Sequence, residues 1–293
     1  MRLVVTGLSG QVTTALQQSA PDTVEIAAIG RPALDLARPA SIYPALAAAD
    51  PDVILSAAAY TAVDKAESEP ELAFAVNADG AGAVAEAARR LGVPLIHLST
   101  DYVFDGAKPA PYVETDPTGP TGIYGASKLK GERAVAAAWD NHVIARTAWV
   151  YAPFGANFVR TMLRLAESRD SVRVVADQLG CPTYAPDIAA AVLTMAGRLV
   201  RDQDPALRGV FHLSGGGETC WADFSRAIFA GLAERGGKQV SVENIGTADY
   251  PTPARRPANS RLSCVKLAEL YGIELPPWRD SLADCLDRLI VAD

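Results

Sequence analysis

The chain has 293 residues, of which 49% are hydrophobic, enough for one large domain with a smaller lobe. Its net charge of −7 and isoelectric point of about 5.1 argue against a nucleic-acid-binding surface, and no apolar run is long enough to span a bilayer. The N-terminus has no signal-peptide pattern, and the four cysteines lack CxxC spacing, which is typical of a reduced, cytoplasmic protein.

The first half of the chain alternates short apolar strands with helices. The strands are continuous apolar runs, without the alternation of a half-exposed sheet. Such strands, separated by helices, indicate a parallel sheet covered on both faces. Right-handed crossovers then give a doubly wound α/β fold of the Rossmann type. The predicted strands are 3–5, 24–29, 53–55, 94–98 and 142–145, and the predicted helices are 11–18, 39–49, 75–91 and 124–138.

The second half is less regular. Helices are predicted at 158–167, 186–199 and 223–234, and a strand at 209–213 is expected to return to the main sheet. We therefore expect a Rossmann domain made of residues 1–149 plus about 184–213. A smaller mixed α/β lobe would comprise about 150–183 plus 214–293. Two Pro-rich loops, 108–120 and 250–257, are long enough to be functional, and the first lies where a substrate would bind.

A glycine-containing turn follows the first strand. Gly7 and Gly10 flank it with G-x-x-G spacing, and the third small position of the usual pattern holds Thr13. Glycine lets the backbone approach a pyrophosphate closely, and the N-terminus of the next helix supplies free N–H groups. The location directly after the first strand favours a dinucleotide-binding turn over an ordinary glycine turn.

Residues after the second and third strands help to predict which dinucleotide is bound. Arg31 follows the second strand, where an acid would bind the ribose 2′-OH of NAD and an arginine suits the 2′-phosphate of NADP. A solvated surface charge is almost as good an interpretation of Arg31. Asp35 is expected to border the adenine, and the small residues Ala57–Ala59 after the third strand allow close passage of a cofactor. NADPH is the expected cofactor, with NADH as the alternative.

Tyr124 and Lys128 form a pair on a predicted helix. Four-residue spacing places their Cβ atoms about 5–6 Å apart on one face. A phenol there can give a proton to a carbonyl, and the neighbouring ammonium favours the resulting phenolate. The spacing alone is common, but Thr100 ends the preceding strand and adds a hydroxyl. A phosphate-binding turn, a hydroxyl and a Tyr-Lys pair, in this order, indicate a carbonyl reductase.

With these residues assembled, the chain resembles the extended short-chain dehydrogenase/reductase superfamily and, within it, the dTDP-4-dehydrorhamnose reductases. The resemblance runs over essentially the whole chain. It implies NADPH-dependent reduction of the C4 ketone of a dTDP-4-keto-6-deoxyhexose, giving dTDP-L-rhamnose in deoxysugar nucleotide biosynthesis. The Rossmann domain would bind NADP and the lobe would bind the dTDP-sugar. The matching segments are 6–12, 58–67, 76–77, 99–106, 124–128, 146–151, 157–158, 177–178, 182–183 and 256–260.

The resemblance also implies residue roles. Thr100, Tyr124 and Lys128 would be the catalytic triad, with Lys128 also reaching the nicotinamide ribose. Some relatives bind magnesium through acidic residues at a dimer contact; we place no such residues here and leave a homodimer open. The residues that would contact the cofactor are Gly7, Gly10, Gln11, Val12, Arg31, Asp35, Leu36, Ala58, Ala59, Thr61, Tyr124 and Lys128. The residues that would contact the sugar are Asp101, Tyr102 and Trp149.

A basic cluster in the second Pro-rich loop stands out in an acidic protein. Arg256 and Arg261 lie beside Asn259, either as a solvated loop or as a clamp for the pyrophosphate of a nucleotide sugar. We expect Arg256 and Asn259 to bind the substrate.

Other conspicuous side chains receive structural interpretations. His97 and His212 lie within apolar strands and are expected to be packing residues. Trp221 and Trp278 are expected in the lobe core or on its surface, without ligand contacts.

Three other functions fit the sequence less well. A sugar-nucleotide dehydratase needs a carboxylic acid beside the Asp, and here Tyr102 follows Asp101. A 4-epimerase usually holds NAD, which Arg31 disfavours. A non-catalytic NADP-binding regulatory homologue would keep the fold, but Thr100 and the Tyr-Lys pair are intact. A reductase of another nucleoside-diphosphate 4-keto-6-deoxy sugar stays open, because neither the sugar nor the stereochemistry at C4 follows from the sequence.

Overall fold

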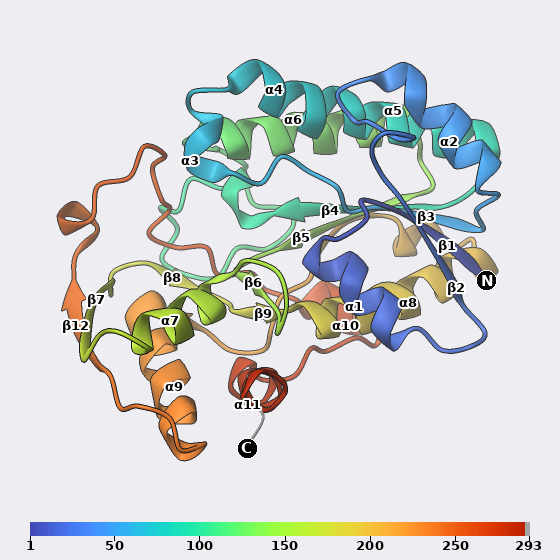
Figure 1. Ribbon diagram of the computed structural model, residues 1–293. Coiled ribbons are helices and arrows are strands. Elements are labelled where there is room, and N and C mark those ends of the chain that lie inside the picture. Colours follow the sequence, from blue (N-terminus) through green and yellow to red (C-terminus); the bar gives the residue numbers. More distant parts are fainter. Residues whose placement is uncertain (291–293) are drawn as a thin grey trace.

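A six-stranded parallel sheet lies at the centre of residues 1–290, the part of the chain that the computed structural model describes (Figure 1). Its strand order is β2–β1–β3–β4–β5–β10, and each neighbouring pair is parallel. The direction of winding changes between β1 and β3, the place where open α/β sheets bind ligands. The predicted fold class is confirmed. The strands are β1 (Arg2–Thr6), β2 (Glu25–Ile29), β3 (Val53–Ser56), β4 (Leu95–Thr100), β5 (His142–Thr147) and β10 (Gly209–His212).

Helices cover both faces of the sheet because successive strand residues point in opposite directions. Leu3 and Val5 of β1 pack into one apolar cluster, whereas Val4 packs into a second cluster on the other face. The two helical layers lie above and below the sheet in Figure 1. The first cluster includes α1 (Gln11–Ser19), α8 (Ala185–Arg201) and α10 (Val265–Tyr271). The second includes α2 (Ile42–Ala48), α5 (Gly80–Leu91) and α6 (Ile123–Ala138).

The predicted helix at 75–91 begins earlier and contains an irregular turn. It runs from α4 (Pro70–Phe74) through the π-helical turn η2 (Ala75–Asp79) into α5. Asn77 in this turn donates from Nδ2 to the Tyr60 carbonyl and to Ser127 Oγ, and its Oδ1 accepts from the Tyr60 N–H. The turn therefore connects the loop after β3 to α6, and π turns are frequent at functional sites.

A smaller lobe lies beside the carboxyl edge of the sheet. Its apolar cluster includes Tyr151, Phe224 and Trp278, so the core placement expected of Trp278 is confirmed. The helices of the lobe are α7 (Phe158–Ala166), α9 (Trp221–Glu234) and α11 (Trp278–Leu289). Its strands pair in twos: β7 (Ser171–Val175) with β12 (Ser241–Ile245), β8 (Leu179–Gly180) with β11 (Thr219–Cys220), and β6 (Val150–Tyr151) with β9 (Thr183–Tyr184).

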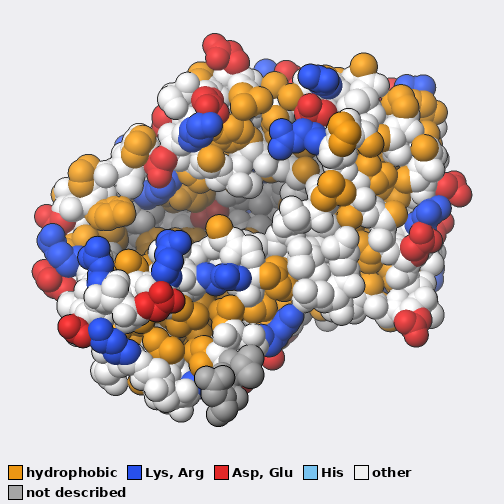
Figure 2. All heavy atoms as spheres, in the orientation of Figure 1, with side chains coloured by type: hydrophobic (Ala, Val, Ile, Leu, Met, Phe, Trp, Pro, Cys, Tyr) orange, Lys and Arg blue, Asp and Glu red, His pale blue; other side chains and the backbone are white. Residues whose placement is uncertain are grey.

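The predicted division of the chain into a Rossmann domain and a lobe stays a prediction. Some residues in the predicted lobe ranges, such as Ala152 and Ile273, belong to the apolar cluster of the sheet. The helix α10 lies within 214–293 but packs Leu267 and Tyr271 against the sheet. Figure 2 shows a hollow between the two parts, with Lys and Arg side chains along its margin. No helix within residues 1–290 is both long and apolar enough to cross a bilayer. The remaining short elements are α3 (Val63–Ala66), η1 (Pro39–Ser41), η3 (Asp101–Val103), η4 (Pro205–Leu207) and η5 (Thr247–Asp249).

Candidate active site

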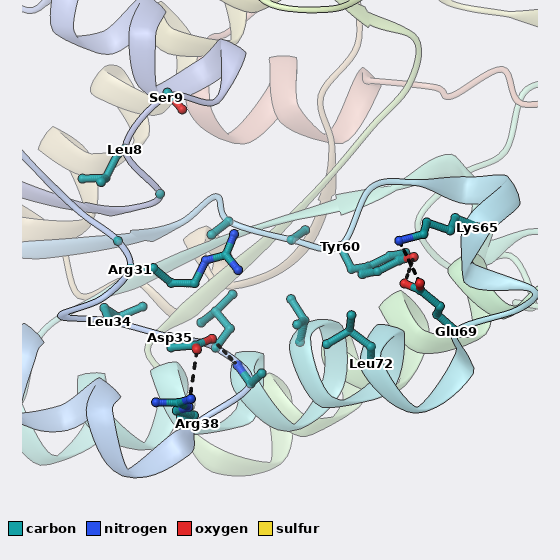
Figure 3. Close-up of a pocket in the computed structure, with 17 residues that line it drawn as sticks. Leu8, Ser9, Arg31, Leu34, Asp35, Arg38, Tyr60, Lys65, Glu69 and Leu72 are labelled. Atoms are coloured by element: carbon teal, nitrogen blue, oxygen red, sulfur yellow. Dashed lines mark hydrogen bonds and ion pairs between the residues drawn. The ribbon is translucent and has the colours of Figure 1, made fainter.

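A pocket of about 780 Å³ lies at the carboxyl edge of the sheet, where β1 and β3 end (Figure 3). Its wall combines the glycine turn, the segment after β2 and the alanines after β3 with apolar side chains of α4 and η2. The predicted cofactor residues that line it are Gly7, Arg31, Asp35, Leu36, Ala58 and Ala59. Lining residues that the sequence did not single out include Leu8, Arg38, Tyr60, Leu72 and Val76.

The glycine turn keeps the pocket open beside α1. Gly7 has a φ of +100°, and a Cβ there would lie 3.3 Å from Ala58 Cβ, so a larger residue would be strained. Gly10 precedes α1, and a Cβ there would meet no protein atom closer than Thr13 Oγ1 at 3.8 Å. No side chain caps the helix N-terminus. Its free N–H groups can therefore bind a phosphate.

The other six predicted cofactor residues lie outside the pocket wall: Gly10, Gln11, Val12, Thr61, Tyr124 and Lys128. The Gln11 side chain donates from Nε2 to the Val150 carbonyl at 3.4 Å and accepts from Asn157 Nδ2 at 3.0 Å, which fixes it against the lobe. Val12 is buried in the sheet cluster. Thr61 is exposed beyond Tyr60. Contacts from these residues to a cofactor stay predictions.

Two arginines from the segment after β2 line the pocket. Arg31 and Arg38 both line it, and Asp35 lies between them in the view of Figure 3. Asp35 Oδ1 accepts from the Ala37 N–H at 3.0 Å, and Oδ2 lies 3.8 Å from Arg38 Nε. Arg38 remains 82% exposed, so both guanidinium groups are accessible to an anion. The position of Arg38 in the pocket could not be predicted from sequence spacing, because it depends on the path of the segment after β2.

The predicted catalytic residues Thr100, Tyr124 and Lys128 do not line this pocket, but the Thr100 and Tyr124 side chains lie within hydrogen-bonding reach of each other. Thr100 is the last residue of β4, and Tyr124 lies in the first turn of α6. The helix can approach closely because residue 125 is glycine: a Cβ on Gly125 would lie 2.2 Å from the Tyr102 carbonyl oxygen. The Tyr124 ring consequently stands edge-on to the Tyr102 ring, with centroids 5.5 Å apart.

Burial changes the acidity of the Tyr-Lys pair. Lys128 is 3% exposed, and its Nζ donates to the Leu98 carbonyl at 2.7 Å. Loss of water lowers the pKa of Lys128 to about 8, with the charge of Glu132 opposing the shift. Burial raises the pKa of Tyr124, and the Thr100 hydroxyl opposes this by favouring the phenolate. Tyr124 therefore carries its proton at neutral pH.

Thr100 is also coupled to an acid. Its hydroxyl donates to Asp101 Oδ1 at 2.9 Å and accepts from the Tyr102 N–H at 3.2 Å. Asp101 is 3% exposed, and burial raises its pKa to about 6. Within residues 1–290, its Oδ2 is buried without a hydrogen-bond partner. An unpaired carboxylate oxygen in this position suits a hydroxyl of a ligand.

Arg256 lies on the other side of Tyr102. It donates from Nη2 to Asp64 Oδ2 at 2.7 Å, while Nη1 is buried and has no partner among the residues described. Burial raises the pKa of Tyr102 to about 12, the charge of Asp101 adds to the shift, and the guanidinium of Arg256 opposes it. Tyr102 and Arg256 therefore interact directly, and Arg256 Nη1 can still donate a hydrogen bond.

Trp149 has a strained backbone and a stacked side chain. Its φ of +48° is unusual for a residue other than glycine, and such strain is often found at functional sites. Its indole stacks on that of Trp221 with centroids 3.4 Å apart, and a Cβ on Gly180 would collide with it. One ring face of Trp149 is therefore covered by Trp221. Trp221 packs against the lobe cluster, in agreement with its expected placement, and supports the predicted sugar contact Trp149.

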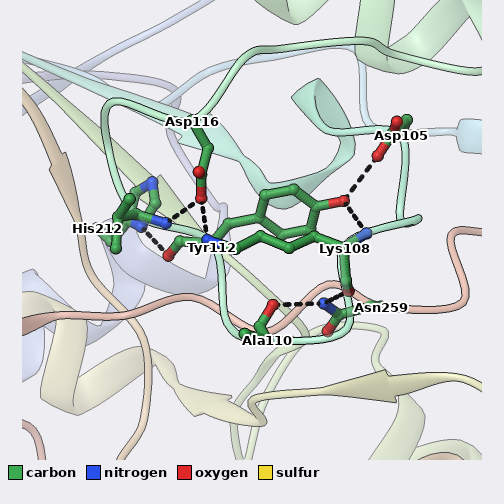
Figure 4. Close-up of polar contacts among 8 residues, drawn as sticks. Asp105, Lys108, Ala110, Tyr112, Asp116, His212 and Asn259 are labelled. Atoms are coloured by element: carbon green, nitrogen blue, oxygen red, sulfur yellow. Dashed lines mark hydrogen bonds and ion pairs between the residues drawn. The ribbon is translucent and has the colours of Figure 1, made fainter.

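The polar groups of Asn259 and Arg261 are hydrogen-bonded within the protein, and Figure 4 shows the Asn259 amide beside Lys108 and Ala110. Asn259 Nδ2 donates to the carbonyls of Lys108 and Ala110, and its Oδ1 accepts from the N–H and Nε of Arg261. Arg261 also contacts Glu218 and the Pro109 carbonyl. These bonds hold the 108–120 loop against the C-terminal segment. Asn259 therefore has no amide group free for a substrate, and Arg261 is no longer a candidate for the clamp.

The sequence left magnesium open without a site. Within residues 1–290, no group of three or more His, Cys, Asp or Glu side chains is arranged to hold a metal ion.

Comparisons with known proteins agree on one family. A family model described as the RmlD substrate binding domain matches residues 1–291. The chain is 58% identical over 281 residues to the dTDP-4-dehydrorhamnose reductase of Sinorhizobium fredii (strain NBRC 101917 / NGR234), covering 96% of this chain and 95% of that protein. It is 44% identical over 296 residues to the protein of the same name from Burkholderia thailandensis, covering 99% of each.

Solved structures give the same result. A dTDP-4-dehydrorhamnose reductase of Clostridium acetobutylicum superposes with a TM-score of 0.92 at 35% identity, covering 99% of both chains. The Bacillus anthracis dTDP-4-dehydrorhamnose reductase, in complex with NADP, superposes with a TM-score of 0.89 at 34% identity, covering 97% of this chain and 98% of that chain. A Thermus thermophilus UDP-glucose 4-epimerase, at 22% identity and a TM-score of 0.78, shares the fold.

Proposed function

We propose that this chain, which belongs to the RmlD family of dTDP-4-dehydrorhamnose reductases, reduces the C4 ketone of dTDP-4-dehydrorhamnose to give dTDP-L-rhamnose, with NADPH as reductant. One observation carries the proposal. The Thr100 hydroxyl lies within hydrogen-bonding reach of Tyr124, and Lys128, one turn after Tyr124 on α6, donates to the Leu98 carbonyl of the strand that carries Thr100. An NADP-bound relative with the same fold supports the choice of cofactor.

The pocket fits a phosphorylated dinucleotide. The open N-terminus of α1 beside Gly10 would bind the pyrophosphate, and Arg31 with Arg38 would bind a 2′-phosphate. Leu72 and Val76 offer apolar surface for a base. The reduced nicotinamide, when bound, supplies the hydride.

The protein's own residues manage the proton and the charge. Tyr124 donates its phenolic proton to the oxygen that develops at C4. The ammonium of Lys128 stabilises the resulting phenolate. The Thr100 hydroxyl, by turning from Asp101 toward the carbonyl, donates a hydrogen bond to the same oxygen. Each group acts most strongly as negative charge forms, which is where stabilisation accelerates a reaction.

The substrate would lie between this edge and the lobe. Asp101 Oδ2 can accept from a sugar hydroxyl, and Arg256 Nη1 can donate to the diphosphate, since both atoms lack protein partners within residues 1–290. The half-buried Trp149 can contact the hexose ring. The dehydratase alternative lacks its acid, because Tyr102 occupies that place.

The test is to compare NADPH oxidation on the dTDP-linked 4-keto sugar with oxidation on the free keto sugar. We expect turnover on the dTDP-sugar alone. Equal activity on the free sugar would overturn the assignment of the substrate. Tight NADPH binding without oxidation on any keto-sugar nucleotide would support the regulatory-protein alternative instead.

A further inference from the structure

His97 connects the catalytic lysine to the interior of the sheet. It lies in β4 and is 1% exposed. Its Nε2 is 3.4 Å from Lys128 Nζ, and its Nδ1 is 3.1 Å from Ser56 Oγ at the end of β3. The sequence predicts a packing residue here, yet the structure places a polar atom of another side chain beside each ring nitrogen.

The partners of His97 determine which nitrogen carries its proton. A lysine ammonium only donates hydrogen bonds, so Nε2 must accept from Lys128. The proton then lies on Nδ1, which donates to Ser56 Oγ. Burial lowers the pKa of His97 well below its usual 6.5, and the charge of Lys128 lowers it further. The ring is therefore neutral and fixed as the Nδ1–H tautomer.

This arrangement fixes the direction of the lysine. Of the three Nζ–H donors of Lys128, one is directed to the Leu98 carbonyl and one to His97. The third has no protein partner within residues 1–290, and Tyr124 lies one turn before Lys128 on the same helix. Ser56 directly precedes Ala57–Ala59, and Ala58 and Ala59 line the pocket. The contacts from Lys128 through His97 to Ser56 therefore end next to the pocket wall.

We propose that His97 is a positioning residue for the reductase: as a neutral Nδ1–H imidazole it accepts a hydrogen bond from Lys128 and thereby holds the ammonium charged and directed toward Tyr124. The proposal rests on the proposed function for its catalytic consequence, but the tautomer is a property of the free protein. A buried histidine that only fills space would have no reason to prefer this tautomer.

Other charged or titratable groups near the pair have partners of their own. Glu132, one turn after Lys128, accepts two bonds from Arg146 and one from Ser99. His142 on β5 affects the pKa of His97, but its Nδ1 donates to the Trp139 carbonyl. Within residues 1–290, the side chain that accepts from Lys128 is that of His97.

The first test is ¹⁵N NMR of the histidine rings in the wild-type free protein, which has three histidines. His97→Gln assigns the resonances by removing one set. We expect His97 to show a protonated Nδ1 and an unprotonated Nε2, with the Nε2 shift moving as Lys128 titrates near pH 8. In Lys128→Met, this pH-dependent shift should vanish while His142 and His212 are unchanged. A protonated Nε2 in the wild type would overturn the proposal whatever the protein reduces.

The second test compares pH profiles of kcat. His97→Leu removes the acceptor, which destabilises the charged form of Lys128, so the alkaline limb should move to lower pH and kcat should fall about tenfold or more. His97→Gln, with a carbonyl acceptor, should restore the limb. His212→Leu is the matched control, since His212 is also fully buried in the sheet but contacts the Tyr112 carbonyl. An unchanged limb in both His97 variants would contradict a positioning role.

Discussion

The cofactor side and the lobe side of the site differ in how many of their polar side-chain groups are already hydrogen-bonded to other protein groups. On the cofactor side, Arg31 and Arg38 lie exposed in an open pocket. On the lobe side, Arg261 and Asn259 are buried and hydrogen-bonded to each other and to the 108–120 loop. Arg256 Nη1, in contrast, has no hydrogen-bond partner within residues 1–290. Charge in a sequence therefore indicates a ligand only where the fold leaves that charge unpaired.

The largest expected effect lies where the two sides meet. Tyr124→Phe should lower kcat by about 10²–10⁴-fold, because the general acid is lost. NADPH binding and the melting temperature should change little, since the ring edge against Tyr102 is kept. Steady-state kinetics and a cofactor titration measure both quantities. Near wild-type turnover would remove Tyr124 from the proton-donor role.

The contrast between two arginines of the lobe side gives the next effect. Arg256→Ala should raise KM for the nucleotide sugar by roughly 10–100-fold, the value of a charge-assisted hydrogen bond, and should leave NADPH affinity unchanged. Arg261→Ala should instead lower the melting temperature, because Asn259 and the Pro109 carbonyl lose their partner. If both variants changed only stability, Arg256 would be a structural residue too.

On the cofactor side, Arg31→Ala and Arg38→Ala should each weaken NADPH by about tenfold and leave NADH nearly unchanged, because only NADPH carries the 2′-phosphate. Equilibrium titrations with both cofactors separate the two effects. If NADPH and NADH affinities fell equally, these arginines would not contact the 2′-phosphate and would act only as surface charges that attract any anion.

The smallest effect concerns stability on the lobe side. The pKa of Asp101 is about 6 in the fold against 3.8 ordinarily, so folding favours its protonated form. That contribution is complete below about pH 4 and is lost as the pH rises to about 6. At pH 8, Asp101→Asn should therefore raise the free energy of unfolding by about 1–3 kcal/mol, and by much less at pH 4. Urea unfolding at both pH values is the measurement, and an equal gain at both would contradict the burial penalty.

Local patterns predicted much of the fold, and pairing across the chain explains what they missed. The sheet strands and their covering helices follow from apolar runs and periodicity, which are local properties. The two-stranded pairs of the lobe are too short to give such a pattern. The π turn at Asn77 depends on contacts with Tyr60 and Ser127, from two other segments.

The same distinction applies to the site. Thr100, Tyr124 and Lys128 could be predicted from the sequence because a strand end and helical spacing place them. Arg38 lies in the pocket because of a loop path, and His97 bonds Lys128 across two elements. The occupied state of Asn259 depends on a loop about 150 residues away, which explains why its free amide was expected.

The most direct test of the central claim is to follow the hydride. The protein would be given dTDP-6-deoxy-L-lyxo-4-hexulose with NADPH deuterated at the transferred C4 position, and the product sugar would be analysed by NMR and mass spectrometry. We predict dTDP-L-rhamnose with one deuterium at C4 for each NADPH oxidised. A product without deuterium at C4, or bound NADPH that is never oxidised, would contradict the assignment as a C4 ketone reductase.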